Sequence, residues 1–183
     1  MNSSSISLDW QIRQVGDLDG DRKSDLVWTN STTGEAAIWL MEGSTMRSGQ
    51  IIAAGLGLQL TYSGDLDGDG KTDLVWRNPT NGDVLLWLMD GLTRRSAQTF
   101  QVGTAWQVQT VADVNGDNRA DLIWRSVSSN EAAVWIMNGT TVTQADFLPT
   151  VSGAWTGGVR RGRLYQISKF RLQIVPLEWM LAL

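Results

Sequence analysis

The strongest constraint on this chain is an internal repeat that is kept at a constant step. Short acidic clusters begin at Asp17, Asp65 and Asp113, and these three positions are equally spaced along the chain. The same step relates three further sets, which are Trp28, Trp76 and Trp124; Trp39, Trp87 and Trp135; and Gly43, Gly91 and Gly139. Because the spacing is kept without insertion or deletion, it predicts three copies of one structural unit, at residues 9–56, 57–104 and 105–152.

Each unit has the pattern of strands. Residues 9–16 alternate polar and apolar side chains, which is typical of a strand with one buried face. Residues 25–30 and 36–41 are apolar runs of strand length, and a tight turn at Glu42 leads to a weaker strand at 46–53. The sequence therefore predicts an all-β protein in which each unit is a four-stranded antiparallel meander.

A single four-stranded sheet of this size cannot bury both of its faces, so we expect the units to stack. Radial stacking of such sheets gives the blades of a β-propeller, which has about 4–8 blades. About three blades leave the ring incomplete. Residues 1–8 are expected to form a lead, and residues 153–183 a partial or aberrant fourth unit or tail that begins at Trp155 without an acidic cluster. Further blades of a longer product, or other copies of the chain, would complete the ring; the third alternative is an open stack.

The chain has neither cysteine nor histidine, which removes whole classes of site. Disulfide frameworks, zinc sites with Cys or His ligands, and catalytic triads or dyads that need His are excluded. Any chemistry must therefore use oxygen atoms, and the chain offers 19 acidic residues against 15 basic ones. No apolar run is long enough to cross a bilayer and residues 1–9 lack the pattern of a secretory signal, so we expect no membrane insertion.

The three acidic clusters have the ligand chemistry of a hard divalent cation. Carboxylate or amide oxygens stand at positions 1, 3, 5 and 9 of each nine-residue loop, and the backbone carbonyl at position 7 is a further candidate ligand. The candidate metal-binding residues are Asp17, Asp19, Asp21, Lys23 and Asp25; Asp65, Asp67, Asp69, Lys71 and Asp73; and Asp113, Asn115, Asp117, Arg119 and Asp121. These groups would repel one another without a cation between them. We expect one Ca²⁺ per loop, three in all, since Ca²⁺ takes about 6–8 oxygen ligands whereas Mg²⁺ demands stricter octahedral order.

An EF-hand loop also opens with Asp-x-Asp-Gly-Asp, but it does not fit this chain. Its twelfth position needs a bidentate Glu, where these loops have Trp28, Trp76 or Trp124. The flanking segments also have the period of strands rather than helices. Calcium-binding nonapeptide repeats are excluded as well, because these loops recur once in each long unit and not every nine positions.

The motif Asp-x-Asp-Gly-Asp-x-x-x-Asp followed by Leu-Val-Trp resembles the FG-GAP (VCBS-type) repeat of integrin α-subunit propellers and of many bacterial surface and secreted proteins. The resemblance covers about residues 10–152, and the recurrent Trp-Leu-Met-x-Gly segment is similar to bacterial members. It implies a calcium-binding loop between the first two strands of each blade and an extracellular or cell-surface location. Asn115 stands where the other loops have Asp, so we expect a weaker third site.

These observations favour a non-catalytic, calcium-binding scaffold for adhesion to a protein or glycan. The alternative is a carbohydrate-binding lectin, in which Trp10, Trp106 or Trp155 would stack on sugars in pockets between blades, while Trp28, Trp39 and their equivalents form the core between blades. A hydrolase-associated domain is a third alternative, but the acids outside the loops form no catalytic constellation. We expect no nucleic-acid partner despite five basic residues after Trp155, and a homo-oligomer if copies complete the ring.

Overall fold

The structure is a computed structural model that describes residues 8–53, 55 and 57–149, and it contains three antiparallel sheets. Blade 1 consists of β1 (Trp10–Gly16), β2 (Asp25–Asn30), β3 (Glu35–Glu42) and β4 (Thr45–Ala53); blade 2 of β5 (Gln59–Gly64), β6 (Asp73–Arg77), β7 (Asp83–Asp90) and β8 (Thr93–Gln101); and blade 3 of β9 (Trp106–Ala112), β10 (Asp121–Ser126), β11 (Ala132–Asn138) and β12 (Thr141–Phe147). Within each blade, every strand pairs with the next strand in sequence. The prediction of an all-β chain of four-stranded meanders is confirmed.

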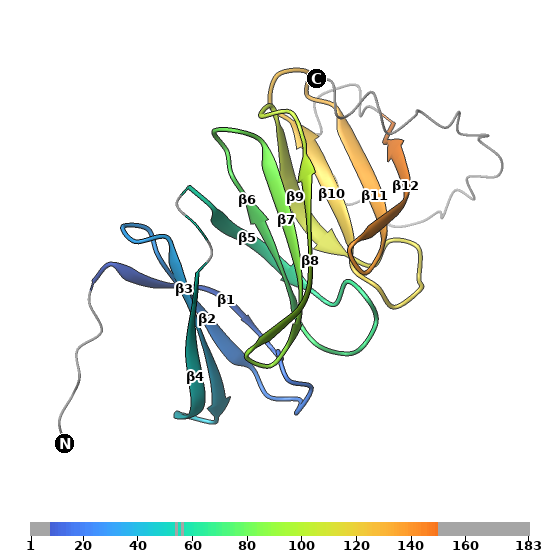
Figure 1. Ribbon diagram of the computed structural model, residues 1–183. Coiled ribbons are helices and arrows are strands. Elements are labelled where there is room, and N and C mark those ends of the chain that lie inside the picture. Colours follow the sequence, from blue (N-terminus) through green and yellow to red (C-terminus); the bar gives the residue numbers. More distant parts are fainter. Residues whose placement is uncertain (1–7, 54, 56, 150–183) are drawn as a thin grey trace, which may run out of the picture.

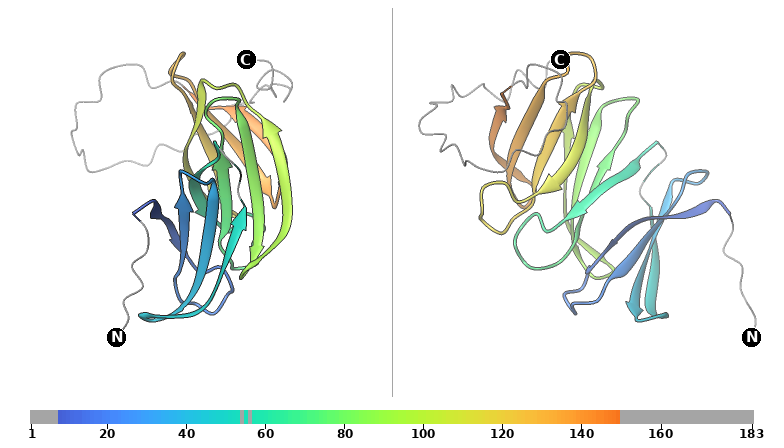
Figure 2. Two further views of the ribbon diagram at one scale, coloured as in Figure 1. Left: turned by 60° about the vertical axis from the view of Figure 1, so that its left-hand side comes forward. Right: turned by 180° about the vertical axis from the view of Figure 1, so that it is seen from behind.

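The three blades lie side by side as an open fan and do not close into a ring (Figure 1). Their first strands, β1, β5 and β9, contact one another in succession, and Figure 2 shows these strands following one another along one side of the fan. The acidic loops join the first strand of each blade to its second. Most of the expected lead and all of the expected fourth unit, including Trp155, lie outside the described residues.

The core of the protein lies between the blades rather than within them. We call the side of a blade that meets the following blade its forward face, and the opposite side its rear face. In the first junction, a forward face of Val27, Ala36, Ile38 and Leu40 packs against a rear face of Leu74, Trp76, Trp87 and Met89. In the second, Val75, Val84, Leu86 and Leu88 pack against Leu122, Trp124, Trp135 and Met137. The alternation of faces follows from the period of two along each strand.

Paired tryptophans dominate each buried rear face. Trp76 and Trp87 lie with their ring centroids 4.9 Å apart, and Trp124 and Trp135 lie 4.8 Å apart, both pairs tilted and fully or nearly fully buried. Tilted pairs of this kind are favourable beyond the area that they bury. The expectation of a tryptophan core between blades therefore agrees with the burial of these four residues. Trp28 and Trp39 differ: they lie on the rear face of blade 1, which has no preceding blade among the described residues, and they are only partly buried.

Candidate metal centres in the acidic loops

Each acidic loop is folded by its own first aspartate. Asp17 Oδ1 accepts a hydrogen bond of 2.7 Å from the amide of Gly20, and Asp17 Oδ2 accepts one of 2.7 Å from the amide of Arg22. The aspartates at position 1 of the other loops, Asp65 and Asp113, make the same two bonds to positions 4 and 6. Both of these positions have positive φ in every loop, which explains the glycine at position 4.

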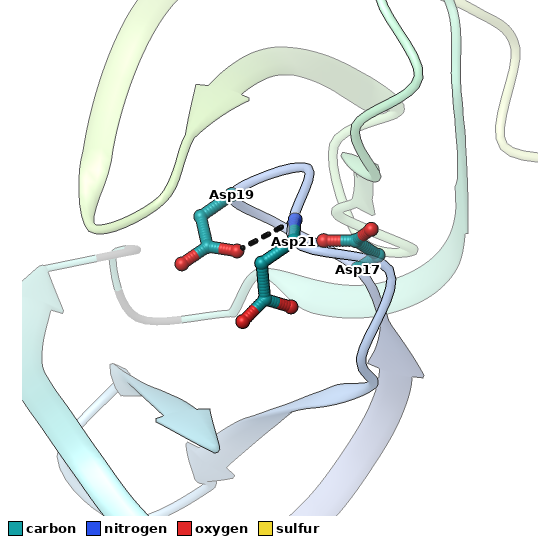
Figure 3. A group of neighbouring side chains, drawn as sticks. All are labelled: Asp17, Asp19 and Asp21. Atoms are coloured by element: carbon teal, nitrogen blue, oxygen red, sulfur yellow. Dashed lines mark hydrogen bonds between the residues drawn. The ribbon is translucent and has the colours of Figure 1, made fainter. Parts of the chain in front are cut away.

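The first two loops each gather three carboxylates closely enough for one cation. In the first loop the ligand oxygens of Asp17, Asp19 and Asp21 lie within 4.8 Å of one another, and Figure 3 shows the three side chains on the turn of the loop. In the second loop the group is Asp65, Asp67 and Asp73. Calcium–oxygen distances of about 2.3–2.6 Å place ligands on opposite sides of an ion about 5 Å apart, so both groups fit the spacing of a hard cation site.

The third loop differs from the other two. Within the described part of the chain, no three of its carboxylates come together as they do in the first two loops. Asn115 replaces an aspartate at position 3, and its Nδ2 donates a 3.1 Å hydrogen bond to Asp117 Oδ2. The amide thus presents a donor toward the neighbouring carboxylate, whereas a cation site needs acceptors.

The aspartate at position 9 is a candidate ligand, and it also joins the loop to the third strand through two hydrogen bonds to backbone amides; we call this pair of bonds the clasp. Asp25, Asp73 and Asp121 begin the second strands and are fully buried. In each, Oδ2 accepts from the backbone amide at position 2 of the same loop, at 2.9, 2.8 and 3.1 Å, and Oδ1 accepts from the amide of the methionine near the end of the third strand, at 2.9, 2.8 and 2.9 Å. Burial raises the pKa of Asp73 to about 7 and also raises that of Asp25, although the backbone bonds oppose the shift.

Two arginines of the outer strands contact the carboxylates at positions 3 and 5. Arg47 on β4 pairs with Asp19, and Arg95 on β8 pairs with Asp67 and with Asp69, the latter at 3.0 Å. These arginines offset part of the repulsion within each cluster. Neither arginine is among the candidate residues predicted from the sequence, although the two occupy equivalent positions of the repeat; the equivalent residue in blade 3 is Thr143.

The position-7 residues shape the loops through their amides. The backbone N–H of Lys23, Lys71 and Arg119 donates to the aspartate at position 5 at 2.8, 2.9 and 2.9 Å. This backbone bond is the main cause that lowers the pKa of Asp21. The side chain of Lys23 also reaches Glu42 at 2.8 Å, beside the hairpin between β3 and β4. The metal-ligand role of the position-7 carbonyls stays a prediction.

The backbone of each loop is also bonded to the following blade. The carbonyl of Asp17 accepts a 2.6 Å hydrogen bond from the amide of Thr72, and the carbonyl of Leu18 accepts one of 2.8 Å from the amide of Gly91. In the second junction the carbonyls of Asp65 and Leu66 accept from Ala120 and Gly139 at the same two distances. The acidic loops therefore lie at the junctions, where a bound cation would stiffen the contact between blades.

Comparison with known families agrees with the sequence pattern. Residues 65–124 match the family model of the FG-GAP-like repeat. Searches of curated proteins and of solved structures find no significant match. In the part of the chain that the structure describes, no helix is long and apolar enough to cross a membrane. The segment that runs from the second acidic loop through the third is therefore an FG-GAP-like repeat, and the resemblance drawn from the motifs is confirmed there.

Proposed function

We propose that the chain is a calcium-binding, non-catalytic scaffold that presents a surface to a protein or glycan ligand outside the cell. The observation that carries the proposal is the grouping of Asp17, Asp19 and Asp21 in one loop and of Asp65, Asp67 and Asp73 in the next. All of these ligands are carboxylate oxygens, the donors that Ca²⁺ prefers. An extracellular location suits this proposal, because calcium is plentiful there.

The role of the ion in this proposal is structural. The loops that gather the carboxylates also accept the backbone hydrogen bonds from the following blade, for example between Asp17 and Thr72. An ion that binds only the folded loop raises the free energy of unfolding by RT ln(1 + [L]/Kd). Calcium would therefore stabilise the stacking of blades, and a stable stack is what a binding surface requires.

Three recurrent acids outside the loops have a role in hairpins, which supports the proposal of a non-catalytic scaffold. Glu35, Asp83 and Glu131 recur at one point of each repeat, in or beside the turn between the second and third strands. Each accepts a hydrogen bond from a nearby turn residue, at 2.8, 2.7 and 2.6 Å respectively. They act as hairpin residues rather than as a facing pair of carboxylates.

Isothermal titration of calcium into chelator-stripped protein tests the metal proposal. The wild type should bind calcium at the first two loops with a matching rise in melting temperature. Asp17→Asn and Asp65→Asn should each remove one strong site. Asp90→Asn is the matched control, because Asp90 is an exposed aspartate beside the second loop that pairs with Lys71. Absence of binding by the wild type, or equal losses in the control, would reject the proposal.

A carbohydrate-binding role is the second candidate, and a groove between blades 1 and 2 favours it. The groove has a volume of about 460 Å³ and is lined by Gln50, Ile51, Ile52, Trp87, Leu92, Thr93 and Arg94. Arg94 covers the Trp87 ring at 4.7 Å, and that ring is only 2% exposed, so the groove would hold a sugar through polar side chains such as Arg94, Gln50 and Thr93. Trp106 is only 3% exposed, so it offers no open ring to a sugar. Binding on a glycan array that is lost in Arg94→Ala and kept in Trp106→Phe would support this second function; no glycan signal would exclude it.

A further inference from the structure

The two junctions inside the chain are built alike, and the outer faces of the stack carry the same features with no partner among residues 8–53, 55 and 57–149. At both junctions, two loop carbonyls of one blade accept from two amides of the next, and a leucine at loop position 2 is buried. The forward face of blade 3 and the rear face of blade 1 are the corresponding surfaces at the ends. Their exposure can therefore be compared, position by position, with that of their buried equivalents.

The forward face of blade 3 is open at the position that seals the inner junctions. Val114 is 51% exposed, whereas its equivalents Leu18 and Leu66 are 0% exposed. Ile123, also on this face, is partly exposed, although its equivalents Val27 and Val75 are fully buried. Within residues 8–53, 55 and 57–149, no backbone amide donates to the carbonyl of Asp113 or of Val114.

The rear face of blade 1 is open in the complementary way. Ile12 is 48% exposed, against 7% for Leu60 and 8% for Val108 at the equivalent positions. Three more large apolar residues on this face are exposed: Val15, Met46 and Ile51, which pair across the sheet with the rear-face positions Leu26, Met41 and Ala37. Ser24 and Gly43, the equivalents of the donors Thr72 and Gly91, are exposed too, and their amides donate to no backbone carbonyl of a described residue. An apolar patch of this kind marks an interaction surface.

We propose that the forward face of blade 3 docks on the rear face of blade 1 of a second copy of this chain. In the contact, the carbonyls of Asp113 and Val114 accept from the amides of Ser24 and Gly43 of the second copy. Val114 enters the apolar surface around Ile12. The second copy is the occupant because its rear face offers donors and apolar side chains in the same places as the inner rear faces. The contact is head to tail, so it produces a ring if the rotation closes and a filament if it does not.

One residue of the forward face departs from the inner junctions. Gly16 and Gly64 end the first strands of blades 1 and 2, where a Cβ at Gly64 would lie 2.9 Å from Val111 and 3.0 Å from Ala120. The equivalent residue in blade 3 is Ala112. Its methyl group must be accommodated between the two copies. Ala112→Gly should therefore tighten the association, which no role of Ala112 within its own blade would predict.

Sedimentation velocity of the full chain and its variants tests the proposal. Val114→Gln places a polar side chain only on the forward face of blade 3, and Ile12→Gln places one only on the rear face of blade 1. We expect the wild type to form rings or filaments, and each variant alone to associate at least about tenfold more weakly, since each loses a buried aliphatic contact. Mixing the two variants should yield a one-to-one dimer, because one intact face of each kind remains. Val127→Gln is the control: Val127 is 65% exposed, and its equivalent Pro79 is exposed even beside an inner junction.

A cysteine pair checks the register of the contact. The chain has no cysteine, so Ala112→Cys in one copy and Ser24→Cys in another create a unique pair, which should form a disulfide on mild oxidation of the mixture. A wild type that stays monomeric at high concentration overturns the proposal, as does a mixture of Val114→Gln and Ile12→Gln with no dimer. The runs are made both with calcium and with chelator. Association without calcium binding would reject the proposed function alone, and calcium binding by a persistent monomer would reject this proposal alone.

Discussion

The carboxylate of Asp73 accepts a 2.8 Å hydrogen bond from the backbone amide of Met89, which joins the start of β6 to the end of β7. Its other oxygen accepts from Leu66, so one buried side chain satisfies two backbone donors. The same clasp occurs in all three blades. It makes the position-9 aspartate necessary for the fold even where no ion is bound.

Asp73→Ala is expected to lower the free energy of unfolding by about 2–5 kcal/mol, because it leaves two buried amides without acceptors. Urea unfolding in chelator measures this effect without any contribution from a metal. Asp90→Ala is the control: its exposed ion pair with Lys71 should contribute at most about 1 kcal/mol. Equal losses in the two variants would contradict the clasp.

The pKa of Asp73 gives the stability of the metal-free protein a particular pH dependence. Burial raises this pKa from its ordinary value of 3.8 to about 7, so the folded state holds a proton that the unfolded state has released. The stabilisation from this group is complete below about pH 3.8 and is lost as the pH rises to about 7. Asp73→Asn cannot titrate at this position. Measured in chelator, the free energy of unfolding of the wild type should therefore fall relative to that of Asp73→Asn as the pH rises from about 3.8 to about 7.

Calcium should couple to the same proton. Coordination by Asp73 requires the carboxylate, so binding at the second loop should release a proton below about pH 7. Titrations in buffers of different ionisation enthalpy measure the release. Asp65→Asn, which removes another ligand of this loop, serves as the control and should abolish that component. A heat of binding independent of the buffer would contradict the coupling.

Arg22 occupies a left-handed backbone conformation, with φ of 66°, where the second loop has Gly70. A side chain is disfavoured there, so Arg22→Gly should raise the free energy of unfolding by about 0.5–1 kcal/mol. Arg22→Asn should also stabilise, because Asn118 adopts this conformation in the third loop. Arg22→Ala removes the same charge without tolerating positive φ. If Arg22→Ala stabilised as much, the gain would come from charge and not from the backbone.

Gly16 allows the first two blades to approach. A Cβ at this residue would lie 2.5 Å from Thr72 Oγ1 and 2.8 Å from Thr72 Cγ2. Gly16→Ala should therefore destabilise the protein by about 1–3 kcal/mol through overpacking. Thr72→Ala removes both atoms, so the double variant should recover part of the loss in a thermal melt. If the effects of the two substitutions were additive, the methyl group introduced at residue 16 would destabilise the protein through a contact other than that with Thr72.

Asn115→Asp should convert the third loop into a stronger calcium site. The substitution replaces an amide donor with a carboxylate beside Asp117, and we expect at least about a tenfold gain in affinity. Asn118→Asp is the matched control, since position 6 is outside the candidate ligand set. Calcium titration distinguishes the two variants, and an equal gain in both would indicate a general effect of negative charge.

Much of this architecture can be predicted from the sequence, because it depends on side chains that repeat. The period of two along the strands and the spacing of Trp76, Trp87 and their equivalents predict the meanders and the core between blades. The buried hydrogen bonds of Asp73 also have a signal in the sequence, because an aspartate that begins an apolar strand is expected to be buried. The bond between Asp17 and Thr72 has no such signal, because it joins backbone atoms that are distant in sequence and carry no residue identity.

Because each loop is hydrogen-bonded to the following blade, the structural unit of the fold does not begin and end where the sequence repeat does. Asp17 belongs to blade 1 by strand order, yet its carbonyl is bonded to blade 2. A fragment cut between residues 56 and 57 would separate that carbonyl from its donor, so a single repeat is not an autonomous unit. Gain or loss of a whole repeat, by contrast, recreates a junction of the same kind. The number of blades can therefore change by duplication without any new type of contact, whereas a shift of a few residues within a loop would disrupt two blades at once.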